Sequence, residues 1–323
     1  MDEVFLGSVL GATLRVATPL LFSALAGLLS ERSGVIDIGL EGKMLSAAFV
    51  TASVGVVTGS FVLALSAGIL VAVLLSMLHG FACVSHAGDQ VISGIAINIL
   101  AAGLCGVLGS AWFRMGGQTP AIPDAIRLDA LWPSMQHAVS GIPWIGEVIG
   151  NGLLSHNILV YLALALVPVV WWLLWCTRFG LRLRAVGENP SMVEAAGVSV
   201  HRMRYLALMM NGVLSGLAGA YLVLAQSPVF VNNMTAGRGY MALAAMIFGK
   251  WHPVGALWAC LLFGFLDAIA IRMQGVDFPM VGEIPVQFVQ ALPYVMTVVL
   301  LGGFFGKAIA PKAIGVPYTK ERT

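Results

Sequence analysis

Long apolar runs separated by short polar stretches dominate the chain, and they predict membrane-spanning helices. A helix needs about 20 mostly apolar residues to cross a hydrocarbon core of about 30 Å, and about 17 to 25 residues qualify. The runs of suitable length are Val4–Leu29, Val35–Val57, Phe61–Cys83, Val91–Phe113, Asn157–Cys176, Tyr205–Ala225, Gly255–Ile271 and Val286–Phe305. Strands of a membrane β-barrel would instead alternate apolar and polar residues over about ten positions. The pattern therefore predicts an all-α fold, a polytopic transmembrane helical bundle.

One further apolar run, Gly239–Gly249, is too short to cross the membrane alone. It fits a half-helix that returns, or one arm of a helical hairpin that turns through Lys250-Trp251-His252-Pro253. Either arrangement requires its irregular backbone to be buried in protein. We therefore expect about nine spans, with eight or ten also compatible, in a single transmembrane domain of residues 1–323.

Composition agrees with a lipid environment. Hydrophobic residues make up 59% of the chain and charged residues 10%, with a mean hydropathy of +0.92. A soluble domain carries about 25% charged residues, so this chain lacks the polar groups to cover a water-facing surface. The net charge of +2 is too small to indicate the strongly basic surface that binds nucleic acid. The four cysteines are scattered without metal-ligand or redox spacing, so neither a metal nor a nucleic-acid partner is expected.

Basic residues predict the orientation, because they concentrate in short cytoplasmic loops. The two basic groups are Arg178, Arg182, Arg184, Arg202 and Arg204 in one loop, and Lys307, Lys312, Lys320 and Arg322 in the C-terminal tail. Five spans precede the arginine-rich loop, so the N-terminus is expected outside and the C-terminus in the cytoplasm. The loop at about 114–156 then faces outward, and the loop at about 177–204 is cytoplasmic. Trp171, Trp172 and Trp175 fit an aromatic belt at the inner interface.

The cytoplasmic loop contains signals for one short helix. Asn189 is a good N-cap, Pro190 suits the first helical position, and Gly197 suits the stop, which together predict a helix over Pro190–Ala196. A helix this short is marginal in water and needs something to hold it. Two interpretations stay open: an amphipathic connector on the membrane surface, or a docking helix for a cytoplasmic protein.

The run GLRLRAVGENPSMVEAAGV at 180–198 resembles the coupling-helix loop of ABC importer permeases. The resemblance is to the family that serves branched-chain amino acids, simple sugars and nucleosides, and it extends from about residue 10 to 305. The stretches Leu29–Met44, Asp89–Asn98 and Gly237–Gly249 are similar to its nucleoside-type subgroup. Lys43 departs from that pattern, where an uncharged residue is expected.

The resemblance implies a type II-like permease subunit of the bacterial inner membrane that translocates nucleosides, with simple sugars such as ribose or galactose as the alternative. It implies separate ATPase subunits that bind ATP and Mg, a second and unlike permease chain, a periplasmic or lipid-anchored binding protein, and membrane lipid around the bundle. The phosphate-binding sequence GxxxxGK[ST] is missing from the sequence, so no cofactor is expected on this chain. The implied ATPase-coupling residues are Gly187, Glu188, Asn189, Pro190, Met192, Glu194, Ala195, Ala196 and Gly197.

Polar residues inside apolar runs are candidates for a translocation path. These candidates are Asp37, Glu41, Asn98, Asn211 and Gln226. Asp37 and Glu41 are four residues apart, on one face of a predicted helix, and are costly in hydrocarbon, so they should face the bundle interior or water. Lys43 and Arg32 are possible partners. The carboxylates either brace a helix break at Ser33-Gly34 or belong to a gate, and the amides bind either substrate hydroxyls or a neighbouring helix.

Two other classes of protein fit the sequence less well. An ion-coupled secondary transporter would use Asp37, Glu41 or Asp267 as its titrating group, but the inverted repeat typical of such transporters is not visible. A membrane-embedded enzyme would need catalytic groups, but the sequence has no nucleophile elbow, and no HExxH or paired-carboxylate pattern sits in an aqueous domain. The histidines at 86, 137 and 156 fall in predicted loops, where solvated side chains are expected.

Overall fold

The computed structural model describes residues 3–140, 146–273 and 309–319, together with 277–278, 282–283 and positions 291 and 295. Within these residues seven helices are long and apolar enough to cross a membrane, which confirms the all-α, polytopic class. The one departure is a pair of two-residue antiparallel strands, β1 (Asp277–Phe278) and β2 (Gly282–Glu283). The predicted span Val286–Phe305 lies outside the described residues, apart from positions 291 and 295.

Each long helix overlaps a predicted run, although the second begins five residues later than predicted and the sixth five residues earlier. The long helices are α1 (Glu3–Arg32), α2 (Leu40–Thr58), α3 (Phe61–Gly80), α4 (Gln90–Phe113), α7 (Ile158–Cys176), α10 (Val200–Tyr221) and α12 (Pro253–Met273). π-helical turns η1 (Phe81–Ser85) and η4 (Leu222–Gln226) extend α3 and α10. The shorter elements are η2 (Asp124–Ile126), α5 (Pro133–Ser140), α6 (Gly146–Ile149), η3 (Gly150–Leu154), α8 (Arg178–Glu188), α9 (Pro190–Ala195) and α11 (Arg238–Phe248).

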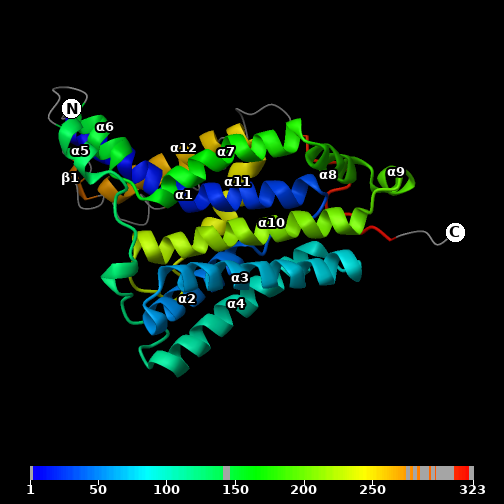
Figure 1. Cartoon of the computed structure of the whole chain (residues 1–323), viewed down its shortest axis with the longest axis horizontal. Coiled ribbons are helices and arrows are strands. Elements are labelled where there is room, and N and C mark those ends of the chain that lie inside the picture. Colours follow the sequence, from blue (N-terminus) through cyan, green and yellow to red (C-terminus); the bar gives the residue numbers. More distant parts are fainter. Residues whose placement is uncertain are drawn as a thin grey trace.

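Helices α1 and α10 form the centre of the bundle, and α3, α4, α7 and α12 lie around them (Figure 1). The apolar window of α1 is 83% buried, whereas those of α3 and α4 are 22% and 28% buried, so the peripheral helices present apolar side chains outward, as lipid requires. Small residues allow α10 to approach α3 closely. A Cβ added at Gly212 or Gly216 would lie 2.6 Å from the Cα of Val73 or Ile69, respectively.

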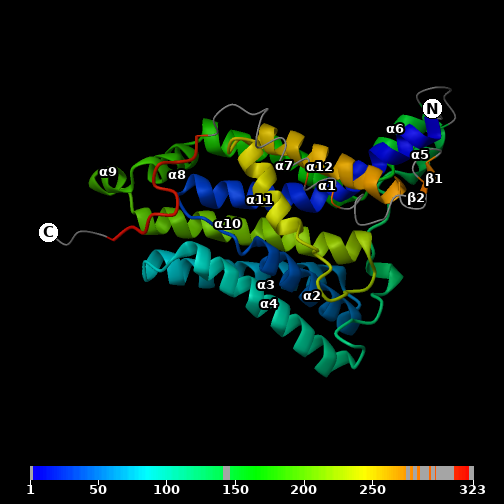
Figure 2. The ribbon, with the colours of Figure 1, turned by 180° about the vertical axis from the view of Figure 1, so that it is seen from behind.

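The short apolar run forms a hairpin with the next span. Helix α11 covers Arg238–Phe248, and the chain reverses through Lys250 and Trp251, which have positive φ angles of 55° and 53°, before α12 begins at Pro253. Figure 2 shows α11 lying obliquely across the bundle. Arg32 holds this turn by donating hydrogen bonds of 2.9 and 2.7 Å to the Trp251 carbonyl oxygen. The hairpin interpretation is therefore confirmed.

The 114–156 loop and the 177–204 loop lie at opposite ends of the molecule (Figure 1). Helices α5 and α6 of the 114–156 loop lie beside the start of α1, while α8, α9 and the segment 309–319 lie at the far end (Figure 1). This separation agrees with the predicted membrane topology, in which these two loops face opposite sides.

Candidate coupling surface and buried polar network

The predicted short helix is present and capped as the sequence indicates. The Asn189 side-chain oxygen accepts a 3.1 Å hydrogen bond from the Met192 N–H, and Pro190 occupies the first turn. Gly197 has a φ of 82°, a left-handed conformation that ends the helix and favours glycine. No residue of α9 is buried, and the Met192 side chain is 69% exposed. Helix α9 therefore projects from the end of the bundle as an exposed surface (Figure 1).

The nine implied coupling residues divide into two groups. Glu188, Asn189, Met192, Ala195, Ala196 and Gly197 are exposed. The others hold the loop together: the buried Gly187 accepts a 2.8 Å hydrogen bond at its carbonyl from the Ala313 N–H, and the Glu194 carboxylate accepts one of 2.9 Å from the Val200 N–H at the start of α10. The first group is available to a partner, and the second fixes its position.

Helix α8, which carries α9, was not anticipated from the sequence. The Thr177 hydroxyl oxygen accepts a 3.1 Å hydrogen bond from the Gly180 N–H and so caps its start. Leu183 and Val186 are buried three residues apart on one face. The threonine cap and this spacing are local signals that could have identified the helix.

A segment near the C-terminus ties α8 to the loop between α1 and α2. Besides the bond from Ala313 to Gly187, the Gly315 N–H donates to the Gly34 carbonyl at 3.2 Å. The Arg204 guanidinium donates to the Val316 carbonyl at 3.4 Å. We call residues 309–319 the C-terminal strap. The strap joins α8, which carries the exposed helix α9, to the loop between α1 and α2.

The prediction that Asp37 and Glu41 share one helix face is wrong. Helix α1 ends at Arg32 and α2 begins at Leu40, so Asp37 lies in the intervening loop. Gly34, with a φ of 86°, breaks the helix at the predicted position. The Asp37 carboxylate accepts a 3.1 Å hydrogen bond from the Gly39 N–H, a turn geometry that competes with helix.

Lys43 is the partner of Asp37, and both side chains are fully buried. The Lys43 ammonium also donates to the Asn211 side-chain oxygen at 3.2 Å. Asn211 accepts from the Ser76 hydroxyl at 3.2 Å and donates to the Ser30 hydroxyl at 3.3 Å. A buried charge is tolerated only when it is paired and hydrogen-bonded, and this network satisfies both conditions for Lys43. Arg32, the other partner considered, instead binds the Trp251 carbonyl.

Glu41 binds a helix terminus inside the bundle. Its two carboxylate oxygens accept hydrogen bonds of 2.8 and 2.6 Å from the N–H groups of Gly237 and Gly239 at the start of α11. The first N–H groups of a helix lack internal partners, and the helix dipole favours a negative charge there. Gly237 offers no side chain to cap the helix, so Glu41 of α2 supplies the cap from another span.

The amides join neighbouring elements. Asn98 donates to the Ile38 carbonyl at 3.0 Å and to the Tyr240 hydroxyl at 2.9 Å, and it accepts from the Gly42 N–H at 2.7 Å. Gln226 stands apart, at the end of η4, where it donates to the Arg15 carbonyl at 2.8 Å. Four of the five candidate path residues therefore connect to the first half of α2 or the loop before it. The sequence did not point to Tyr240, Ser76 or Ser30 as their partners.

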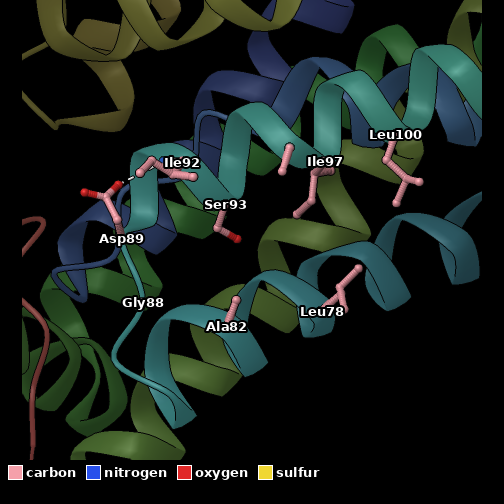
Figure 3. A pocket seen from close by; sticks show the side chains of 9 residues that line it. Leu78, Ala82, Gly88, Asp89, Ile92, Ser93, Ile97 and Leu100 are labelled. Carbon is pink, nitrogen blue, oxygen red and sulfur yellow. Dashed lines mark hydrogen bonds between the residues drawn. The ribbon is translucent and has the colours of Figure 1, made fainter.

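An apolar groove lies between the end of α3 and the start of α4, with a volume of about 570 Å³ (Figure 3). Leu78, Ile92 and Leu100 are among its lining side chains. Its polar members are already bonded: Asp89 caps α4 by accepting from the Ile92 N–H at 2.9 Å, and the Ser93 hydroxyl lies 3.0 Å from the His79 ring. The groove has the character of a lipid-facing surface.

The histidine expectation holds for one residue and fails for another. His86 is exposed, as predicted, whereas the side chain of His137 lies outside the described residues. His156 is only 1% exposed and lies 3.0 Å from the Gly152 carbonyl through its Nε2. The prediction of a solvated His156 is wrong because the end of the 114–156 loop folds back through η3, which packs against α1.

This architecture defines a polytopic helical membrane protein in which hydrogen bonds join the buried residues Asp37, Glu41, Asn98 and Asn211 to neighbouring elements, and in which α9 projects beyond the end of the bundle (Figure 1). Residues 9–301 match the family described as "Branched-chain amino acid transport system / permease component". The chain belongs to this family, and it is therefore a transport permease of the ABC class and not an enzyme.

Two relatives resemble it over their whole length. The guanosine ABC transporter permease protein NupQ of Bacillus subtilis is 37% identical, with 100% of both chains covered. The nucleoside ABC transporter permease protein NupC of Lactococcus lactis is 39% identical over 95% of each chain. A solved inward-facing ABC transporter assigned to the metal-chelate type has a TM-score of 0.52 and 15% identity, covering 91% of this chain and 84% of that one. That likeness concerns the fold alone.

Proposed function

We propose that the chain is the permease subunit of an ATP-driven nucleoside importer in the bacterial inner membrane, and that α9 seats in a groove of a separate ATPase subunit. The observation that carries the coupling role is that no α9 residue is buried, and that Ser191, Met192 and Ala195 are exposed, on a helix that is nonetheless capped at both ends. The arginines of α8 and α10 support a cytoplasmic position for this end, with the N-terminus outside.

The coupling would run through bonded elements. Movement of α9 displaces α8, and α8 is joined to the C-terminal strap by the bond between Gly187 and Ala313. The strap is joined in turn to Gly34, at the start of the loop that contains Asp37. ATP-driven closure of the ATPase subunits would thereby reposition the loop and the α2 segment that carries Lys43. ATP and Mg belong to the ATPase, and a binding protein delivers substrate to the opposite face.

The experiment that tests coupling uses the full transporter purified from membranes. Ala195→Trp adds bulk to the exposed face of α9, so ATPase co-purification and uptake should both be lost while membrane insertion is retained. Ala125→Trp, at an exposed position of η2 at the other end, is the matched control and should retain the ATPase. Normal ATPase binding and uptake with Ala195→Trp would refute the docking role.

Nucleosides are the substrate class that the two full-length relatives support, with simple sugars as the alternative. Among the candidate path residues, Asn98 offers suitable chemistry because its amide bonds the hydroxyl of Tyr240, whose side chain is 47% exposed. An aromatic ring can stack on a base, and an amide can bind a ribose hydroxyl. The other four candidates would support the path indirectly, by joining the helices around it through hydrogen bonds. These residues are Asp37, Glu41, Asn211 and Gln226.

Uptake in proteoliposomes separates these possibilities. A nucleoside importer takes up labelled guanosine with ATP after the ion gradient is collapsed, whereas a secondary transporter does not. Tyr240→Leu should raise the KM for guanosine more than Tyr240→Phe does, because phenylalanine keeps the ring. Labelled ribose transported in preference to guanosine would select the sugar alternative. The mass of the purified complex tests our proposal that the second permease is an unlike chain.

A further inference from the structure

Two arginines from different elements lie against one tryptophan at the α8 end of the bundle. The Arg184 guanidinium carbon is 5.3 Å from the centre of the Trp175 ring, and that of Arg32 is 5.5 Å from the same centre. The Trp175 ring and both arginines are partly exposed. Cation–π contacts hold guanidinium groups in place without neutralising their charge. The arrangement therefore places two cations close together.

No carboxylate neutralises this pair within the part of the chain that the structure describes. Neither arginine forms an ion pair there, and the two guanidinium groups repel each other electrostatically. Glu188 attracts Arg32 electrostatically but lies beyond ion-pair distance. Arg184 uses only its Nε, which donates to the Leu174 carbonyl at 3.0 Å, among the contacts of the described residues. Its two terminal nitrogens are left as donors for an anion.

The cluster lies where lipid headgroups are expected. Trp171 and Trp172, in the last turns of α7, are 40% and 57% exposed. Tryptophans at the end of a span mark the boundary between the hydrocarbon and the headgroups. Lys250 is exposed in the α11–α12 turn, which Arg32 holds by its bonds to Trp251. A guanidinium pairs with a phosphate through two parallel hydrogen bonds, and basic sites between spans bind anionic headgroups.

We propose that Arg32, Arg184 and Trp175 form a binding site for the phosphate of an anionic phospholipid in the leaflet at the α8 end. The lipid phosphate neutralises the two arginines and fastens α7 and α8 to the end of α1. Because α8 carries α9, the bound lipid also restricts the movement of α9 relative to the bundle. The site depends on the chain's position in a bilayer and not on the substrate or ATPase proposed above.

Native mass spectrometry of the full transporter, purified in mild detergent, tests the site. Samples are incubated with phosphatidylglycerol, with phosphatidylcholine, or with inorganic phosphate as a competitor. The wild type should retain phosphatidylglycerol in preference to phosphatidylcholine, and Arg184→Gln should reduce that retention about tenfold. Arg182→Gln removes an equal charge from an exposed position of the same helix and should leave retention unchanged.

Equal retention by Arg184→Gln and Arg182→Gln would overturn the proposal. Equal retention of the two lipids by the wild type would do so as well, and that comparison needs no variant to fold. Displacement of the lipid by millimolar inorganic phosphate would assign the site to free phosphate and reject the lipid. Since the readout is bound lipid, neither loss nor retention of nucleoside uptake affects the result.

Discussion

The ammonium group of Lys43 lies against the carboxylate of Asp37, and neither side chain is exposed. Lys43 belongs to the first turn of α2, whereas Asp37 belongs to the loop before it. The pair thus fixes the end of this loop to the helix that follows, and Asn211 extends the contact to α10. The buried charge of Lys43 is accommodated because the chain supplies its counter-charge six positions away.

Replacing Lys43 with methionine should destabilise the protein severely. The change leaves the Asp37 carboxylate buried without its partner, which typically costs about 3–5 kcal/mol. The double variant Lys43→Met/Asp37→Asn removes both charges and should recover much of the loss. The free energy of unfolding in detergent measures both effects. Lys250→Met, at an exposed turn, is the control, and a single variant as stable as this control would contradict the buried pair.

Glu41→Gln should weaken the start of α11. A glutamine keeps one acceptor oxygen but loses the second acceptor and the negative charge at the helix N-terminus, an effect of about 1–2 kcal/mol. Hydrogen exchange of the Gly237 and Gly239 amides should accelerate in the variant. Asp124→Asn is a suitable comparison, because Asp124 is 96% exposed and should tolerate the change. Unchanged exchange at both glycines would argue against the capping role.

Gly187→Ala should displace α8, the helix that carries α9. A Cβ at this position would collide with the Arg32 carbonyl oxygen and lie 3.1 Å from its carbonyl carbon. Overpacking of this kind costs about 1–3 kcal/mol, and the displaced α8 should also reduce ATP-dependent uptake. Gly103→Ala is the matched control, because a Cβ there meets nothing within 4 Å. Equal thermal stability and uptake in the two variants would count against a tight fit at Gly187.

Acid should destabilise the 114–156 loop through His156. Burial lowers the pKa of this imidazole below its ordinary value of 6.5, because the charged form is disfavoured inside the protein. The unfolded chain then binds a proton that the folded chain resists, so the stability is fully present above pH 6.5. It falls as the pH drops below that value. Denaturation curves between about pH 8 and 5 measure the slope.

His156→Gln should flatten this pH dependence, since glutamine has no proton to gain. His86→Gln changes an exposed histidine and should leave the slope intact. If the wild type and His156→Gln lose stability equally on acidification, another group is responsible.

Several features could be predicted from the sequence because their causes are local. The length of an apolar run determines whether it can span lipid, and α1, α3, α4, α7 and α12 follow the runs closely. The α9 helix follows from Asn189, Pro190 and Gly197, whose own geometry starts and stops a helix. The break at Gly34 is equally local. Helix α8 was missed although Thr177 offered a local cap.

Other features depend on contacts between distant segments. Nothing near Glu41 in the sequence indicates that it caps α11, almost 200 residues away, and Asn98 finds Tyr240 only after folding. The same holds for the bond between Gly187 and Ala313.

By itself, then, the sequence determined the helical class, most of the spans and the short capped helix, because hydrophobic length and backbone preference act over a few residues. Tertiary structure decided which polar groups face each other. A buried charge or helix terminus needs a partner close in space, and the packing of α1, α2 and α10 selects that partner whatever its place in the chain.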